Sequence, residues 1–118
     1  MGTVTLTEAT FETTVTQDGI VLVDWWASWC GPCRSFAPVF EAAADEHPDI
    51  VFGKVDTEAE QDLAIEFGIQ SIPTVMAIRD GVVVYQQPGA LPESALESLI
   101  SQVRALDMAE VKAKAQAA

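Results

Sequence analysis

The sequence is poor in metal ligands. Its 118 residues include two cysteines, Cys30 and Cys33, and one histidine, His47. A structural zinc site uses four protein ligands, and a catalytic one uses three together with a solvent molecule. His47 is expected beyond the far end of the helix that follows the cysteines, away from both thiols. Metal binding by a single chain is therefore disfavoured, and we expect no metal site.

Basic residues are also few. Six Lys and Arg stand against 18 Asp and Glu, which gives a formal net charge of −12. Such a charge repels the phosphates of nucleic acids and the head groups of anionic lipids. We expect neither nucleic acid nor a membrane among the partners. The surplus of carboxylates is explained most simply by solvation, although it could also steer basic partners.

Long apolar runs and targeting signals are missing as well. No apolar run approaches the roughly 20 residues that cross a bilayer. The N-terminus has no basic region followed by an apolar stretch, and Leu6 occupies the place of the Ser or Thr in a myristoylation motif. We expect a soluble, cytoplasmic protein, although a chain from which a leader had been removed would look the same. The length suits a single domain with a real core.

The two cysteines stand close together in Cys30-Gly31-Pro32-Cys33, directly after an apolar run over residues 20–27. That run predicts a buried strand, and the fixed φ of Pro32 suits the first turn of a helix. Cys30 would then lie at a helix N-terminus, where unpaired backbone N–H groups and the helix dipole favour a negatively charged sulfur. We therefore predict that Cys30 is a nucleophile.

A purely structural disulfide between these cysteines would contribute little. It would close a ring of four residues, for which the loop-entropy relation gives only about 2 kcal/mol. A reversible dithiol and disulfide couple uses the short spacing directly, because Cys33 could resolve a mixed disulfide formed on Cys30. We favour this interpretation over a metal site and over a structural disulfide.

The rest of the chain alternates strand-like and helix-like segments. Strands are predicted at residues 3–6, 20–27, 50–55, 75–78 and 82–85, and helices after Thr7, from Pro32 to His47, across 59–67 and from Pro92. Asp80-Gly81 predicts a tight hairpin, Gly68 a helix end, and Pro38 a helix kink. This order predicts an α/β protein with a mixed, mostly parallel sheet of about five strands, flanked on both faces by about four helices.

The end of the chain lies outside this pattern. We expect one domain over residues 1–104 and a helical or frayed tail over residues 105–118. The simplest interpretation of the tail is a frayed continuation of the last helix, and the alternative is a partner-binding segment.

Asp24 stands inside an otherwise apolar strand. A carboxylate in such a place is expensive to ionise, so its pKa should rise. Apolar neighbours on both sides favour a strand covered on both faces over a solvent-exposed edge position. Lys54, on a later predicted strand, would more often extend to solvent than act in a site.

Several segments together resemble the thioredoxin family. They are residues 23–34 (VDWWASWCGPCR), Pro38, Lys54-Val55-Asp56, Ser71-Ile72-Pro73-Thr74 and Gly89. The resemblance covers about residues 3–104 in the right order and spacing, which a lone two-cysteine motif could not provide. It implies the thioredoxin fold.

The resemblance also implies roles for individual residues. Cys30 would be the attacking thiolate and Cys33 the resolving thiol. Asp24 would lie behind Cys33 and relay its proton, with Lys54 approaching the same carboxylate. Residues that would support the active site are Gly31, Pro32, Pro73 and Trp26.

In the family, the peptide bond at the position of Pro73 is cis and packs against the active-site sulfurs. It would present the backbone of Ile72 to an extended substrate segment, and such main-chain pairing tolerates many side chains. The resemblance further implies an exposed apolar collar around Cys30, formed by Trp29, Gly31, Ile72, Gly89 and Ala90. From the residues alone, Trp29 and Ile72 could equally belong to an ordinary core.

The function implied by the resemblance is general protein-disulfide reduction. The Gly31-Pro32 spacer resembles that of reducing members, whereas oxidising and isomerising relatives usually carry a His beside the second cysteine. Electrons would come from NADPH through a flavoprotein thioredoxin reductase, and the domain would hold no bound cofactor beyond its own Cys30–Cys33 disulfide. The partners would be that reductase and disulfide-containing proteins, and we expect a monomer.

Two alternatives remain open: a disulfide oxidant or isomerase of the same fold, and a non-catalytic binding or structural subunit.

Three positions also depart from the family pattern. Arg34 replaces the usual Lys, Trp25 is bulkier than the usual Phe, and Gln87-Pro88 is more polar and stiffer than the usual approach to Gly89. These departures bear on partner preference.

Overall fold

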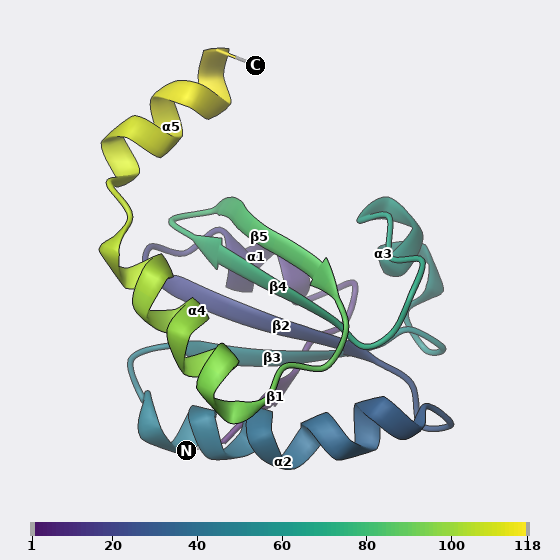
Figure 1. Ribbon diagram of the computed structural model, residues 1–118. Coiled ribbons are helices and arrows are strands. Elements are labelled where there is room, and N and C mark those ends of the chain that lie inside the picture. The colour runs from purple at the N-terminus through teal and green to yellow at the C-terminus, as the bar shows by residue number, and fades with distance from the viewer. Residues whose placement is uncertain (1, 118) are drawn as a thin grey trace.

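The computed structural model describes residues 2–117, with side chains up to residue 115 (Figure 1). The strands are β1 (Val4–Thr5), β2 (Ile20–Trp26), β3 (Val51–Asp56), β4 (Thr74–Arg79) and β5 (Val82–Pro88). The helices are α1 (Phe11–Val15), α2 (Gly31–Glu46), α3 (Gln61–Glu66), α4 (Glu93–Ala105) and α5 (Met108–Ala117). No helix among the described residues is both long and apolar enough to cross a membrane.

The strands form one mixed sheet in the order β1-β3-β2-β4-β5. Strand β2 lies at its centre and pairs parallel with β3 and antiparallel with β4, while β1 pairs parallel with β3 and β5 antiparallel with β4. The predicted hairpin between β4 and β5 is confirmed. Asp80 (φ 52°) and Gly81 (φ 80°) both adopt the left-handed backbone that a tight two-residue turn requires.

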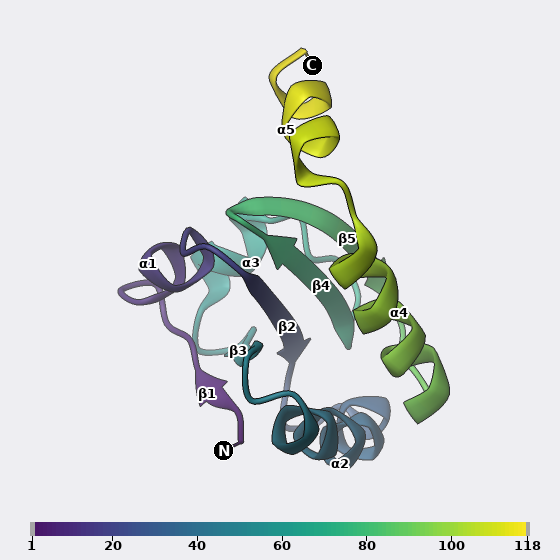
Figure 2. The ribbon, with the colours of Figure 1, turned by 90° about the vertical axis from the view of Figure 1, so that its left-hand side faces the viewer.

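Two apolar layers cover the two faces of the sheet, because successive residues of a strand point to opposite faces. Figure 2 shows α2 and α4 on one side of the sheet and α1 and α3 on the other. Under α2 and α4 the core contains Leu22, Phe36, Phe40, Phe52 and Ile100, and under α1 and α3 it contains Phe11, Val23, Trp25, Leu63 and Met76. The even-numbered residues of β2, Asp24 included, therefore face α2 and α4.

The first helix begins later than the sequence predicted. The carbonyl oxygen of Thr7 accepts hydrogen bonds from the N–H groups of Thr10 (3.1 Å) and Phe11 (2.9 Å), and the N–H of Thr7 donates to Oγ1 of Thr10 (3.0 Å). These bonds form a turn over residues 7–10, so α1 starts at Phe11 and Thr7 is not its N-cap. The sequence carried no signal that distinguished the two threonines.

The third helix is shorter than predicted. It covers Gln61–Glu66, and Ala59 lies exposed before it. Gly68 follows with a φ of +67°, and the N–H of Ile69 donates to the carbonyl oxygen of Ala64 (2.9 Å). The predicted helix end at Gly68 is therefore confirmed, because this left-handed residue redirects the chain as a C-terminal cap does.

The tail does not continue the fourth helix. Leu106 adopts an extended backbone (φ −62°, ψ 139°), and Asp107 accepts a hydrogen bond from the N–H of Glu110 (3.2 Å). A new helix, α5, begins at Met108 and leads away from the sheet (Figures 1 and 2). The proposed division at residue 104 stays a prediction, and its outer limits, residues 1 and 118, lie outside the described residues.

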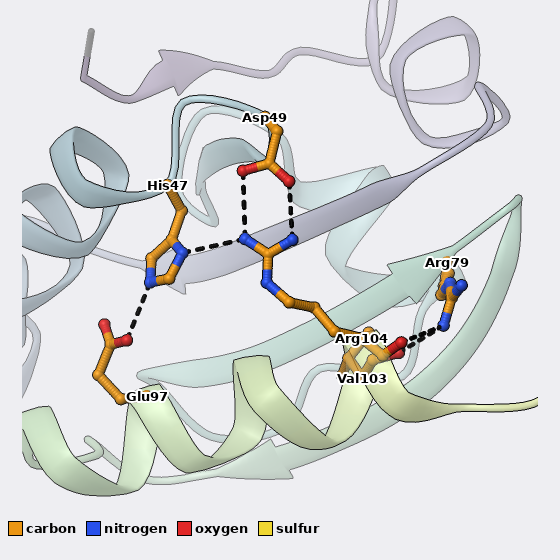
Figure 3. Close-up of polar contacts among 6 residues, drawn as sticks. All are labelled: His47, Asp49, Arg79, Glu97, Val103 and Arg104. Carbon is orange, nitrogen blue, oxygen red and sulfur yellow. Dashed lines mark hydrogen bonds and ion pairs between the residues drawn. The ribbon is translucent and has the colours of Figure 1, made fainter.

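A polar network joins the end of α2 to α4 (Figure 3). Arg104 donates two hydrogen bonds to the carboxylate of Asp49 (2.7 and 3.1 Å) and a third to Nδ1 of His47 (3.0 Å). Because a guanidinium can only donate, Nδ1 accepts, and Nε2–H of His47 donates to Glu97 (2.9 Å). The carboxylate of Asp49 has a lowered pKa, chiefly through the hydrogen bond from Arg104.

Candidate active site

Cys30 lies at the junction of β2 and α2. It is the N-cap residue of α2, with an extended backbone (φ −85°, ψ 113°), and Pro32 occupies the first turn as predicted. Its Sγ accepts a hydrogen bond from the N–H of Cys33 (3.1 Å). The helix N-terminus therefore directs a backbone donor at this sulfur, which favours the thiolate form once the thiol is free.

The two cysteines form a disulfide, with their Cα atoms 5.2 Å apart. Cys30 is 4% exposed and Cys33 is 3% exposed, so the pair is largely covered. The opposite side of Cys30 is bounded by the loop before β4, where the carbonyl oxygen of Ile72 lies 3.8 Å from Sγ. The disulfide thus sits between a helix N-terminus and a loop.

That loop carries the cis peptide bond between Ile72 and Pro73 that the resemblance implied. Pro73 is buried, and its carbonyl oxygen accepts a hydrogen bond from the N–H of Gly89 (2.7 Å). Gly89 follows β5 and has a φ of +110°, a backbone conformation suited to glycine. These contacts bring three segments that are distant in the sequence to one end of the sheet.

The five collar residues differ in their exposure. Trp29 is 64% exposed, which rules out an ordinary core position for it. Gly89 and Ala90 are exposed, while Gly31 and Ile72 are partly exposed. Trp29 and Ile72 border one depression of about 190 Å³, whose other lining residues are Thr57, Ile69, Gln70 and Ser71.

From the sequence, none of these other lining residues has an expected binding role, although Ser71 stands in the Ser71-Ile72-Pro73-Thr74 segment that carries the resemblance. Gln70 and Ser71 directly precede Ile72, so they could have been included by proximity in the sequence. Thr57 had no such signal. It reaches this end of the sheet because β3 runs parallel to β2, and its N–H and hydroxyl both donate to the carbonyl oxygen of Trp26 (2.8 and 3.0 Å).

Asp24 is completely buried in the central strand. Neither of its carboxylate oxygens has a hydrogen-bond partner among the residues that the structure describes. Burial raises the pKa of Asp24 from 3.8 to about 7, and the charge of Lys54 opposes this rise. The edge position considered from the sequence is wrong, because β2 has a neighbour on each side.

Lys54 is the register partner of Asp24 on β3. Its side chain is 19% exposed, and Nζ lies 3.8 Å from Oε2 of Glu41 on α2 and 5.2 Å from the ring centre of Trp26. No ion pair between Lys54 and Asp24 occurs within residues 2–115. Trp26 therefore contacts Lys54, while the tryptophan exposed beside the disulfide is Trp29.

The described residues contain one group that could supply metal ligands. Glu46, His47 and Glu97 place three ligand atoms within 4.8 Å of one another. However, Arg104 donates to Nδ1 of His47, which places the ring proton on Nε2, toward Glu97. A metal on Nε2 would have to displace that proton and the Arg104 contact, and this group contains neither cysteine.

The site therefore contains two cysteine sulfurs joined in a disulfide, a helix N-terminus that directs a backbone N–H at one of them, and a buried carboxyl group with a pKa near neutrality. These components suit thiol–disulfide exchange, in which a thiolate attacks a disulfide and a second thiol resolves the product.

Comparison with known proteins also indicates thiol–disulfide exchange. The thioredoxin family model matches residues 2–102. Putative thioredoxin 2 of Streptomyces coelicolor is 59% identical over 110 residues, covering 93% of this chain and 82% of that protein. Thioredoxin of Alicyclobacillus acidocaldarius is 41% identical over 102 residues, covering 86% of this chain and 97% of that protein.

Solved structures agree as well. Thioredoxin of Plasmodium falciparum superposes with a TM-score of 0.77 at 33% identity, over 85% of this chain and 97% of that one. The Malassezia sympodialis thioredoxin gives 0.78 at 32% identity, over 86% and 91%. With its pair of cysteines joined at the start of α2, this chain belongs to the thioredoxin family of protein-disulfide oxidoreductases.

Proposed function

We propose that this chain is a general reductant of protein disulfides, with Cys30 as nucleophile, Cys33 as resolving thiol and Asp24 as the acceptor of the Cys33 proton. The observation that carries the proposal is the position of Cys30, whose sulfur receives a backbone hydrogen bond at the N-terminus of α2. Family membership supports the reaction type. The roles of Cys33 and Asp24 follow from the resemblance to the family, and the raised pKa of the buried Asp24 supports its role.

In the first step, the Cys30 thiolate attacks one sulfur of a substrate disulfide. A bond forms between Cys30 Sγ and that sulfur, the substrate S–S bond breaks, and the other substrate sulfur leaves as a thiolate. The N–H of Cys33 and the dipole of α2 stabilise the attacking charge before the step.

In the second step, Cys33 resolves the mixed disulfide. Its thiol gives up a proton, which Asp24 accepts, and the resulting thiolate attacks Cys30 Sγ. The Cys30–Cys33 bond forms, and the second substrate sulfur leaves as a thiolate. The substrate gains two electrons and the chain ends in the disulfide form that the structure shows. A base with a pKa near the working pH suits this proton transfer.

Substrate recognition would rest on the surface beside Cys30. Trp29 offers an exposed ring, and Gly31, Ile72, Gly89 and Ala90 add small or apolar groups around it. The backbone at Ile72 would pair with an extended substrate segment, which places few demands on the substrate's side chains. We therefore propose a broad range of protein substrates.

We further propose that electrons reach the Cys30–Cys33 disulfide from NADPH through a thioredoxin reductase, in the cytoplasm. The Gly31-Pro32 spacer supports a reducing over an oxidising role, and a reductant of this kind needs a compartment where thiols stay reduced. Equilibration with a glutathione buffer tests this proposal. A reducing member stays largely oxidised at ratios that keep an oxidising member reduced.

The reaction itself is tested by insulin reduction coupled to a reductase and NADPH. Cys30→Ser should abolish turnover, and Cys33→Ser should accumulate mixed disulfides that a gel without reductant reveals. Ser35→Ala, an exposed change on the same helix, is the matched control and should retain the rate. Turnover that survives in Cys30→Ser would refute the proposed role of Cys30.

A further inference from the structure

Within the described residues, the ammonium group of Lys54 forms an ion pair with Glu41 and none with Asp24, although Lys54 and Asp24 are neighbours in the sheet. In their parallel register, both side chains start on the face of the sheet that α2 and α4 cover. Yet Nζ lies 3.8 Å from Oε2 of Glu41 and 5.2 Å from the ring centre of Trp26, and both Asp24 oxygens lack a partner within the described residues.

Few charged or titratable groups surround Asp24. Its register partner on β3 is Lys54, and its partner on β4 is the apolar Val75. Helix α4 turns only apolar residues toward the core, namely Leu96, Leu99, Ile100 and Val103. Helix α2 buries Cys33, which is joined to Cys30 and can titrate only when that disulfide is reduced, beside Phe36, Phe40, Ala43 and Ala44. Within residues 2–115, Lys54 is therefore the cation whose charge acts on Asp24.

We propose that Glu41 is a positioning residue for thiol exchange: together with the Trp26 ring it holds the Lys54 ammonium outward, and so prevents a direct ion pair between Lys54 and Asp24. This inference rests on the proposed function, since it concerns the base that accepts the Cys33 proton.

The consequence follows from simple electrostatics. A lysine paired directly with Asp24 would stabilise the carboxylate and make it a weaker base. When Lys54 is held against Glu41, the ammonium charge stabilises the Asp24 carboxylate only weakly. Burial then remains the main influence on the pKa of Asp24. Glu41 thereby keeps Asp24 basic enough to accept a thiol proton near neutral pH.

The direct test is the pKa of Asp24, followed by carboxyl-carbon NMR during pH titration of the oxidised protein. Glu41→Gln should lower this pKa by up to about 0.7 pH units, which is the largest pKa shift expected from an exposed ion pair. Glu46→Gln, an exposed change at the end of α2, is the matched control and should leave the value unchanged. An unchanged pKa in Glu41→Gln would overturn the proposal.

A double-mutant cycle separates action through Lys54 from a direct field of Glu41. In the Lys54→Met background, Glu41→Gln should no longer shift the pKa of Asp24, because the cation it positions is gone. The same shift in both backgrounds would show that Glu41 acts directly, and the proposal would be wrong. Glu41→Asp, which keeps the charge, should restore most of the wild-type value.

The rate readout distinguishes this inference from the proposed function. In single-turnover reduction of a peptide disulfide, the pH profile of Glu41→Gln should move in the same direction as the pKa of Asp24. If Cys30→Ser abolishes turnover while Glu41→Gln moves neither pKa nor profile, the reductase stands and the role of Glu41 falls. If the pKa moves and the profile does not, Asp24 is not the acceptor of the Cys33 proton, and the proposed role of Glu41 in thiol exchange is refuted with it, while the role of Cys30 stands.

Discussion

At the scale of single residues, the most unusual feature is a carboxyl group without hydrogen-bond partners among the described residues in the centre of a sheet. Burying a carboxylate without compensation is expensive, and the group responds by holding its proton to higher pH. Asp24 thus lowers the stability of the folded chain near neutral pH. A residue that destabilises its own fold is understandable when it serves the chemistry beside it.

Asp24→Asn should raise the free energy of unfolding at pH 8 and have little effect near pH 4. The pKa of Asp24 is about 7 in the folded chain, whereas an aspartate in the unfolded chain has the ordinary value of 3.8. Between these values the unfolded chain has lost a proton that the folded chain keeps, so stability falls as the pH rises from about 4 to about 7. The gain at pH 8 should reach up to about 4 kcal/mol.

Urea denaturation of the oxidised protein at both pH values measures this gain, and Asp62→Asn, an exposed change on α3, serves as the control. A gain of equal size at pH 4 and pH 8 would show that ionisation is not its cause.

At the scale of elements, the fourth helix depends on a side chain from the sheet. Arg79, at the end of β4, directs Nη1 at the carbonyl oxygens of Val103 (2.8 Å), Arg104 (3.1 Å) and Leu106 (3.0 Å), as Figure 3 shows for the first two. The last carbonyls of a helix lack partners within the helix, and a cation is favoured there. Arg79 thereby fixes where α4 ends and where the tail begins.

Arg79→Met should lower the free energy of unfolding by about 1.5–3 kcal/mol, because a charged donor to three carbonyls is lost while the apolar stem remains. Chemical denaturation at neutral pH gives the value. Arg34→Met is the control, since the exposed Arg34 donates one hydrogen bond, to the carbonyl oxygen of Ser28. Equal losses in both variants would contradict a special role for Arg79.

The edge strand β1 depends on the absence of a side chain at Gly53 of β3. A Cβ at this position would lie 2.9 Å from Cγ of the buried Leu6, closer than carbon atoms allow. Gly53→Ala should therefore cost about 1–3 kcal/mol of stability by overpacking. The same change in a Leu6→Ala background should cost much less, because the clash is removed. Equal costs in the two backgrounds, measured by denaturation, would refute the steric explanation.

At the scale of the whole molecule, the formal charge of −12 creates a long-range field around the proposed substrate-binding surface. We expect a cationic peptide disulfide to be reduced faster than an anionic one of the same length at about 20 mM salt. Raising the salt to about 500 mM should bring the two rates together, because the screening length falls below 5 Å or so. Stopped-flow measurement of both rates tests this expectation. If the ratio of the two rates does not change with salt, short-range contacts rather than the long-range field cause the preference.

The tail is attached to the rest of the molecule at few points. Met108 is 9% exposed, and Lys112 forms an ion pair with Asp80 (3.7 Å). Leu106, by contrast, packs against the core and accepts a hydrogen bond from Arg79. A chain ending at Leu106 should therefore keep full reductase activity and lose at most about 3 kcal/mol, the value of one buried Met. A chain ending at Arg104 should lose more, and equal stability of the two would contradict this boundary.

Much of this molecule could be predicted from local sequence features. The apolar run of β2, the cysteine pair before Pro32 and the Asp80-Gly81 turn each determine their own local structure, because strand burial, helix initiation and left-handed turns depend on residues close in the chain. The high pKa of Asp24 also followed from its apolar neighbours alone. The predicted start of α1 was wrong because Thr7 and Thr10 are both suitable residues to precede a helix, and local sequence does not distinguish them.

Only the tertiary structure decided which distant groups meet. The contact between Lys54 and Glu41 depends on how α2 crosses β3, and the capping of α4 by Arg79 depends on where β4 ends beneath that helix. No spacing along the chain encodes such contacts. They arise because packing two helices on one face of a twisted sheet fixes which side chains share a surface, and charges far apart in the sequence then interact through a few ångströms of protein.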